Sequence, residues 1–315
     1  MNNLEKITRP AAPPALSDPA RIGALIDAFL SARDVSQNSK FTYRRTLKIF
    51  FDWIDENPPG PFNMETILKY KADLTAQGYT AASVSNCISA VRCFFTWAES
   101  MKYFPNIAKG VKGAKTGRDH RRDGFAVEQA KEILAAIDRT TPQGKRDFAL
   151  INLKFHTALR DIEVSRANIE DMGTKDGAQI LRIRGKGRDE KDAFVILTPS
   201  ALGPIREYLK TRKAKDSDPL FVSHGPRNGG GRLTTLAISR IVKERARRVG
   251  IISRRLTSHS CRHSAITFAL MAGATIQEAQ ALGRHANINT TLIYSHNLDR
   301  IASAPEKKID TLLNG

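Results

Sequence analysis

Cysteine is scarce and scattered in this sequence. Its 315 residues include three cysteines, Cys87, Cys93 and Cys261. No two of them form a CxxC pair, and on a helix a separation of six residues places Cys87 and Cys93 on different faces. This pattern excludes a disulfide framework and gives no indication of a structural zinc site. We therefore expect a protein of a reducing compartment, without a bound metal.

Long apolar runs are missing as well. No uninterrupted run approaches the roughly 20 residues that a membrane helix requires. The opening residues, MNNLEKITRP, lack the apolar stretch of a secretory signal. A GxxxxGK[ST] phosphate-binding loop is also absent, since the glycine-rich run at 225–232 reads GPRNGGGR. These absences favour a cytoplasmic protein with no membrane partner.

Acidic residues are too few to balance the basic ones. Lysine and arginine number 50 against 32 aspartates and glutamates, which leaves a formal net charge of +18. Such an excess is typical of proteins that bind a polyanion, because contacts to phosphates release condensed counterions. The charge therefore predicts a nucleic-acid partner. Basicity that serves only solubility is the alternative.

Hydrophobic periodicity divides the chain into two helical parts. Residues 1–20 carry four prolines and predict a flexible N-terminal arm. Residues 21–112 show apolar residues at spacings of three and four, which predict four amphipathic helices in a small bundle. Its aromatic residues lie within the apolar stripes, so we assign them to the bundle core rather than to base stacking. They are Phe50, Phe51, Trp53, Phe94, Phe95 and Trp97.

Residues 113–124 lose this periodicity, gain glycine, lysine and arginine, and predict a basic linker. Residues 125–315 predict a second domain, again mainly helical. Two short β-prone runs, 180–184 and 193–197, flank a charged G-K-G turn and read as a hairpin. The fold class is therefore mainly α with a small β-sheet.

Several polar residues of this second part become informative through their order and spacing. Taken singly, each fits a structural role such as a helix cap, a charged turn or a surface position. Together they form a T-A-L-R-x-x-E segment, a G-K-G turn, an H-x-x-R segment and a histidine nine residues before a tyrosine. The residues are Arg160, Glu163, Lys186, His259, Arg262, His285 and Tyr294.

In this combination the sequence resembles the tyrosine site-specific recombinases, the phage integrase family, over most of residues 21–315. The resemblance implies an all-α, SAM-like core-binding domain at 21–112 and an α+β catalytic domain at 125–315. One departure is Arg284, which stands between the glycine and the histidine of the family's Leu-Gly-His pattern. Another is Asp189, where a second basic residue is common, and Lys191 is therefore a rival to Lys186.

The resemblance also implies the chemistry. Tyr294 would attack a DNA phosphodiester and form a 3′-phosphotyrosyl link, which stores the bond energy, so that rejoining requires neither ATP nor a metal. Arg160 and Arg262 would stabilise the negative charge of the transition state, because a guanidinium donates in a planar fork and stays charged. His285 would add a third donor.

The remaining roles concern protons and orientation. His259 would accept the phenolic proton, because an unperturbed tyrosine has a pKa of about 10 and needs a base at neutral pH. Lys186 would protonate the leaving 5′ oxygen. Glu163 would orient the residues that touch the phosphate.

The implied partner is double-stranded DNA with specific recombination sites, bound by a protein that is monomeric when free and a homotetramer in the synaptic complex. An accessory protein is a further candidate partner, and the C-terminal segment 298–313 is expected to dock on a neighbouring protomer. Basic and polar residues on both parts are candidate DNA contacts, chiefly to phosphates. They are Lys40, Tyr43, Arg44, Arg45, Lys48, Asn86, Arg92, Lys115, Arg118, Arg121, Arg122, Arg232, Arg254 and Arg255.

Two other functions share these residues. A type IB topoisomerase uses a similar site to relax supercoils without pairing DNA sites, and a DNA-binding protein could keep the fold without catalysis. The helical N-terminal domain of about 90 residues favours the recombinase over the topoisomerase, and the complete residue set argues against an inactive protein. Within the recombinases the sequence favours a Xer-like or mobile-element enzyme, and it leaves both integration or excision and DNA-dimer resolution open.

Overall fold

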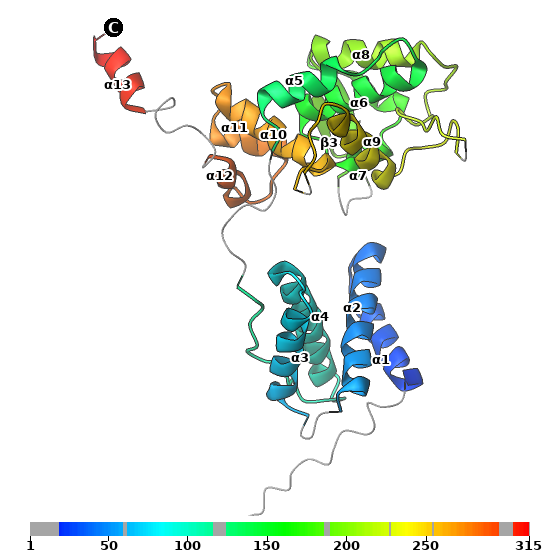
Figure 1. The fold of residues 1–315 in the computed structure, drawn as a ribbon, viewed down its shortest axis with the longest axis vertical. Helices are drawn as coiled ribbons and strands as arrows, with labels where there is room; N and C mark the ends of the chain where they lie inside the picture. Colours follow the sequence, from blue (N-terminus) through cyan, green and yellow to red (C-terminus); the bar gives the residue numbers. More distant parts are fainter. Residues whose placement is uncertain are drawn as a thin grey trace, which may run out of the picture. The chain divides into compact units, whose positions relative to one another are not determined.

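The computed structural model describes residues 19–58, 62–115, 124–185, 190–226, 228–253, 255–295 and 305–314. The chain divides into two units, Met1–Asp119 and His120–Gly315, here called the first and the second unit. The division lies inside the basic stretch at 113–124. Figure 1 traces the first unit in blue to cyan and the second in green to red.

In its described residues the first unit contains four helices, α1 (Pro19–Ser31), α2 (Gln37–Glu56), α3 (Met64–Ala76) and α4 (Ala81–Ser100). Local sequence signals set their starts. Side-chain oxygens of Ser36, Asn63 and Thr80 accept hydrogen bonds from the first N–H groups of α2, α3 and α4. These caps satisfy donors that every helix leaves unpaired. The helices pack as the small bundle that the sequence predicts (Figure 1).

Aromatic side chains fill the interior of this bundle. Phe50, Phe94 and Phe95 are fully buried, and Phe50 and Phe94 each meet neighbouring rings edge to face at centroid distances of 5.0–6.1 Å. Trp97 packs on the same cluster while remaining partly exposed. The assignment of these rings to the core is confirmed. Such contacts add to the burial of apolar area and stabilise the bundle.

The second unit is mainly helical with a small sheet, which confirms the predicted fold class. Before the sheet come α5 (Val127–Ala135), α6 (Pro142–Thr157), α7 (Asp161–Arg166) and a short 3₁₀ helix (Ile169–Asp171). After it come α8 (Pro199–Leu209), α9 (Thr235–Arg248), α10 (Ser258–Met271), α11 (Ile276–Gly283), α12 (Asn289–Ser295) and α13 (Pro305–Asn314). Among the described residues of both units, no helix combines the length and apolarity needed to span a membrane.

The sheet has one more strand than the predicted hairpin. Strands β1 (Met172–Lys175), β2 (Ala178–Ile183) and β3 (Ala193–Ile196) pair antiparallel in the order β1-β2-β3. β1 and β2 join through Asp176 and Gly177, which have φ angles of 49° and 78°. An Asp-Gly pair with two positive φ angles is the turn that best matches the twist of a tight hairpin. This dipeptide was the signal for β1 that the sequence analysis missed.

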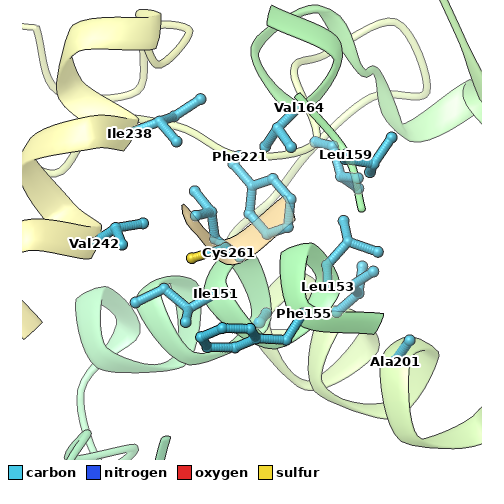
Figure 2. Packing of buried hydrophobic residues seen from close by; sticks show 14 of the residues in the cluster. Ile151, Leu153, Phe155, Leu159, Val164, Ala201, Phe221, Ile238, Val242 and Cys261 are labelled. Carbon is cyan, nitrogen blue, oxygen red and sulfur yellow. The ribbon is translucent and has the colours of Figure 1, made fainter. Parts of the chain in front are cut away.

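Helix α6 lies at the centre of the second unit and packs against α8, α9 and α10. Figure 2 shows Ile151 and Phe155 of α6, Val242 of α9 and Cys261 of α10 in one cluster of buried residues, which also contains Phe221. Ile151 and Cys261 are fully buried. This apolar interior fixes the end of α6, which Arg160 follows, and the start of α10, which carries His259 and Arg262.

Candidate active site

The turn between α6 and α7 presents Arg160. Ala158 adopts the left-handed conformation with φ 51°, which ends α6, and Arg160 then forms the N-terminal cap position of α7. Glu163, one turn into α7, accepts from the backbone N–H of Arg160 at 2.7 Å and from its Nη1 at 2.8 Å. The R-x-x-E spacing thus closes a ring in which a buried carboxylate holds both the backbone and the side chain of Arg160.

Arg262 enters the same place from α10. Its side chain is 2% exposed, Nη1 donates to the carbonyl of Ala158 at 2.6 Å, and Nη2 donates to the carbonyl of Gly283. One guanidinium therefore connects the end of α6, helix α10 and the end of α11. The structure brings Arg160 and Arg262 together although 102 residues separate them.

A third arginine joins these two. Arg284, which the sequence analysis noted only as a departure, has φ 50° at the end of α11. Its Nη2 donates to Glu163 Oε2 at 2.9 Å and to the carbonyl of Ala158 at 3.1 Å. Glu163 is thus shared between Arg160 and Arg284, which gives the inserted arginine a defined place in the site.

The resulting cluster holds three guanidinium groups around one carboxylate. Burial, followed by the charges of Arg160 and Arg284, lowers the pKa of Arg262 to about 9. Burial alone would raise the pKa of Glu163, but Arg284 and Arg160 outweigh it and hold that pKa below its ordinary value. Three positive charges against one negative charge, partly desolvated, form an environment that a phosphate would stabilise.

His285 and Tyr294 lie beside this cluster. Their rings stack with an interplanar angle of 12° and a centroid distance of 6.1 Å. Nδ1 of His285 lies 2.9 Å from the hydroxyl of the buried Thr291, and when that hydroxyl donates, the proton of the neutral ring sits on Nε2. Tyr294 is 5% exposed, and burial raises its pKa, which Arg262 and Arg160 offset in part. Its phenol is therefore protonated at neutral pH and requires a base.

A second histidine, His263, lies between the candidate base His259 and Tyr294 and contacts both rings. The rings of His259 and His263 meet edge to face at 5.0 Å, and the ring of His263 lies 5.2 Å from that of Tyr294. His263 follows Arg262 directly and was passed over in the sequence. Its spacing of four from His259 puts both rings on one helix face, and this was the available signal.

The pKa of His285 predicts a pH-dependent stability of the second unit. Burial of the ring, followed by the charges of Arg262 and Arg160, lowers this pKa to about 4. An unfolded histidine titrates near pH 6.5, so between about 6.5 and 4 the unfolded chain binds a proton that the folded protein does not. The His285 contribution is therefore complete above pH 6.5 and decreases as the pH falls towards 4. We expect the melting temperature of His285→Gln to depend less on pH in this window than that of the wild type. An equal change of melting temperature with pH in both proteins would contradict the lowered pKa of His285.

The two candidate lysines of the hairpin are placed differently. Lys186 lies outside the described residues. Gly185, the last described residue before it, accepts a hydrogen bond from Nη1 of Arg166 at 3.3 Å. Lys191 donates to the buried carboxylate of Asp171 at 2.5 Å. The rival lysine is therefore engaged in an ion pair of its own.

The candidate DNA contacts differ in exposure and in the partners that they already have. Exposed side chains, as expected for phosphate contacts, belong to Arg45, Asn86, Arg92, Lys115 and Arg255. Arg44 and Lys48 are also exposed, and they pair with Asp27 and Asp52 on the surface, where such pairs are weak. Lys40 is half-buried. Arg118, Arg121, Arg122 and Arg254 lie outside the described residues.

Two further candidates make internal contacts. Tyr43 is half-buried, packs against Phe29 at 5.7 Å and accepts from Arg33 at 3.4 Å. Arg232 donates to the carbonyl of Ser165 at 2.8 Å and to the side chain of Asn168 at 2.6 Å. Its guanidinium thereby holds the glycine-rich segment against α7. Among the described residues, no three histidine, cysteine or acidic side chains are grouped as metal ligands.

Comparison with known proteins identifies the family of this chain. Residues 125–300 match the model of the phage integrase family, and residues 24–102 match the SAM-like N-terminal domain of phage integrases. The chain belongs to the phage integrase family. Its function is site-specific recombination of DNA by cutting and rejoining, and the alternatives of a topoisomerase and of an inactive DNA-binding protein are not favoured.

Individual relatives agree with this. A tyrosine recombinase XerD of Listeria innocua is 28% identical over 289 residues, which cover 86% of this chain and 93% of the relative. A tyrosine recombinase XerA of Pyrococcus horikoshii is 30% identical over 79% of this chain and 82% of its own length. In fold, the chain is similar to a XerH site-specific recombinase solved with a palindromic difH substrate, at a TM-score of 0.71 and 20% identity over 90% of this chain and 85% of that one. A lambda integrase dimer bound to a core site has a TM-score of 0.65, 18% identity and coverage of 86% and 94%.

Proposed function

We propose that this recombinase cuts DNA by attack of Tyr294 on a phosphodiester and holds the cut strand as a 3′-phosphotyrosyl intermediate. One observation carries the proposal: a buried phenol lies beside a cluster of three arginines that contains a single carboxylate. The cluster suits the negative charge of a phosphate in its transition state, and the phenol supplies the oxygen nucleophile.

The charged groups have distinct tasks in this mechanism. Arg160 and Arg262 donate to the non-bridging oxygens, where each contributes about 10²- to 10³-fold to the rate by analogy with an oxyanion-hole donor. The neutral ring of His285 donates from Nε2 to the same phosphate. Glu163 holds Arg160 in place and neutralises part of the cluster.

Proton transfer completes the reaction. His259 accepts the phenolic proton as Tyr294 attacks, and the contact of His263 with both rings supports a path through this second histidine. Lys186 protonates the departing 5′ oxygen. The ion pair between Lys191 and the buried Asp171 favours Lys186 for this role, because the ammonium of Lys191 is already held by a carboxylate and directed away from a DNA oxygen.

Cellular context and assembly follow from the reaction. Double-stranded DNA with specific sites is the substrate, and the protein works in the cytoplasm on the nucleoid, either on a mobile element or on DNA dimers. Strand exchange between two duplexes requires four active sites, so we propose a homotetramer on DNA that forms from free monomers. An accessory protein would join this complex where the direction of recombination is controlled. Phosphate contacts come from the exposed basic residues of both units.

A substrate that traps the cut strand tests this mechanism. The target is first identified by sequencing DNA that copurifies covalently with the protein. A nicked fragment of that target then loses its short downstream piece after cleavage, so that rejoining fails and the adduct accumulates. Mass spectrometry should locate the nucleotide on the peptide that contains Tyr294. An adduct on another residue would overturn the proposal.

Helix α13 is expected to support the assembly. Its side chains Ile309, Leu312 and Leu313 are 55%, 84% and 74% exposed, which leaves an apolar surface available for a neighbouring protomer. Truncation after Ser303 should abolish ordered synaptic complexes while a single protomer still binds its DNA half-site. Gel-shift titration and native mass spectrometry measure the two properties. Unchanged synaptic complexes would contradict this role of α13.

A further inference from the structure

A second polar group lies behind the arginine cluster, on the α6 side of Arg160. Lys154, near the end of α6, has a fully buried side chain. Its Nζ donates to Asp161 Oδ1 at 2.6 Å and to the carbonyl of Leu159 at 3.1 Å. These two acceptors stand on either side of Arg160 in the sequence, so Lys154 holds the turn that presents this arginine.

The same carboxylate oxygen extends the connection to α10. Ser258, the first residue of α10 and 1% exposed, donates its hydroxyl to Asp161 Oδ1 at 2.6 Å. The next residue along this helix is His259, and Arg262 lies one turn further on. Asp161 therefore joins the segment of Arg160 to the start of the helix that carries the H-x-x-R pair.

The ion pair of Lys154 and Asp161 is expected to contribute little to stability, because burying the two charges costs hydration energy. A buried ammonium and its carboxylate lose much of their hydration, and apolar residues of similar size often stabilise a protein as well or better. An ion pair does, however, define a geometry through directed short contacts, which an apolar replacement would not. A network that meets two catalytic segments is better explained by positioning than by stability.

A comparable group elsewhere in the unit shows the contrast. Asp147, near the other end of α6, is 2% exposed, accepts from Arg146 at 2.7 Å and also pairs with Arg245 of α9. Arg146 donates in turn to the carbonyl of Val222 at 3.1 Å. Among the described residues, these hydrogen bonds and ion pairs of Asp147 and its partners involve the framework of the unit and not Arg160, Glu163, Arg262 or Arg284. The chain thus offers a buried ion cluster as an internal control.

We propose that Asp161, together with Lys154 and Ser258, is a positioning group that fixes Arg160 relative to His259 and Arg262. Asp161 acts through these neighbours and does not itself touch the DNA. The inference rests on the proposed roles of Arg160, His259 and Arg262. Loss of the connection should displace the donors from the phosphate, and a misplacement of about 1 Å can slow a reaction by about 100-fold.

The decisive variant removes both charges at once. Lys154→Met or Asp161→Asn alone leaves a charged group without its partner and should lower the melting temperature. The double variant K154M/D161N leaves no unpaired charge and should recover most of that loss. Its rate of adduct formation at saturating nicked DNA should nevertheless stay about 10- to 100-fold below that of the wild type, with the Kd for intact DNA changed by less than about threefold.

The control is Asp147→Asn, which should lower the melting temperature but leave the saturating rate within about twofold of the wild type. Ser258→Ala removes only the hydrogen bond from α10 to Asp161. It should reduce the saturating rate of adduct formation with little change in the Kd for DNA. A double variant that cleaves at the wild-type rate would overturn the proposal. The proposal would also be overturned if the cleavage rate fell in proportion to the melting temperature in every variant, including Asp147→Asn.

A measurement without DNA separates this inference from the proposed function. Hydrogen exchange should accelerate in the double variant for peptides covering both 157–163 and 258–263, and it should remain at the wild-type level in Asp147→Asn. Unchanged exchange in these two segments would overturn the connection whatever the nucleophile proves to be. Conversely, an adduct that maps away from Tyr294 in the wild type would overturn the proposed mechanism and leave the exchange result intact.

Discussion

Tyr294→Phe is expected to abolish the covalent protein–DNA adduct, with a loss of at least about 10⁴-fold in the cleavage rate, because the substitution removes the phenolic oxygen that acts as the nucleophile. The phenylalanine ring retains the stacking on His285 and the place in the buried cluster that contains Ala158 and Leu270. The variant should therefore fold and bind its DNA site as the wild type does. Gel electrophoresis of the nicked substrate under denaturing conditions measures the adduct.

Tyr208→Phe is a matched control for this loss. Tyr208 is fully buried in the second unit, and its hydroxyl accepts from the backbone N–H of Val222 at 3.3 Å, so the substitution removes a buried hydroxyl outside the proposed site. Cleavage should persist in this variant even where stability declines. An adduct that forms equally well in Tyr294→Phe would show that another residue is the nucleophile.

Arg262→Lys should reduce the rate of cleavage by about 10²- to 10³-fold, although it keeps the positive charge. The guanidinium donates to the carbonyls of Ala158 and Gly283 in two directions, and its planar fork carries further N–H groups for the proposed contact with a phosphate. A single ammonium cannot make this set of contacts with the same geometry. The expected loss therefore concerns the saturating rate of adduct formation more than the Kd for DNA.

A second arginine that binds carbonyls provides the control for this prediction. Arg212 donates to the carbonyls of Pro219 at 2.5 Å and Leu220 at 3.3 Å, away from the arginine cluster. Arg212→Lys should lower stability and leave the saturating cleavage rate nearly unchanged. Comparable rate losses in both variants would indicate that Arg262 acts only through the stability of the fold.

The inserted Arg284 gives the cluster of this chain its particular charge balance. Glu163 offers one oxygen to Arg160 and the other to the backbone of Arg160 and to Arg284. Burial lowers the pKa of Arg284, while the charge of Glu163 raises it in part. The positive charges are therefore held close together before DNA arrives, and a preorganised site of this kind need not rearrange during the reaction.

Much of the local structure followed from the sequence alone. Periodicity predicted the helices of both units, and the caps Ser36, Asn63 and Thr80 confirm that their starts are encoded within a few residues. The ordered motif residues indicated the family, because their spacing along the chain is itself the signature. The Asp176-Gly177 dipeptide also indicates a tight turn from sequence alone. It was overlooked, and strand β1 was therefore not predicted.

Only the tertiary structure decided which residues meet. Arg284 and Glu163 are 121 positions apart in the sequence, and Ser258 and Asp161 are 97 apart. No local sequence pattern therefore predicts either contact. The burial of Lys154 was equally invisible, since a lysine near a helix end is ordinarily exposed to water. Sequence determines helices and turns through interactions between near neighbours. The charge balance and positioning of this site instead arise where α6, α7, α10 and α11 converge, and that convergence is set by the packing of the apolar core.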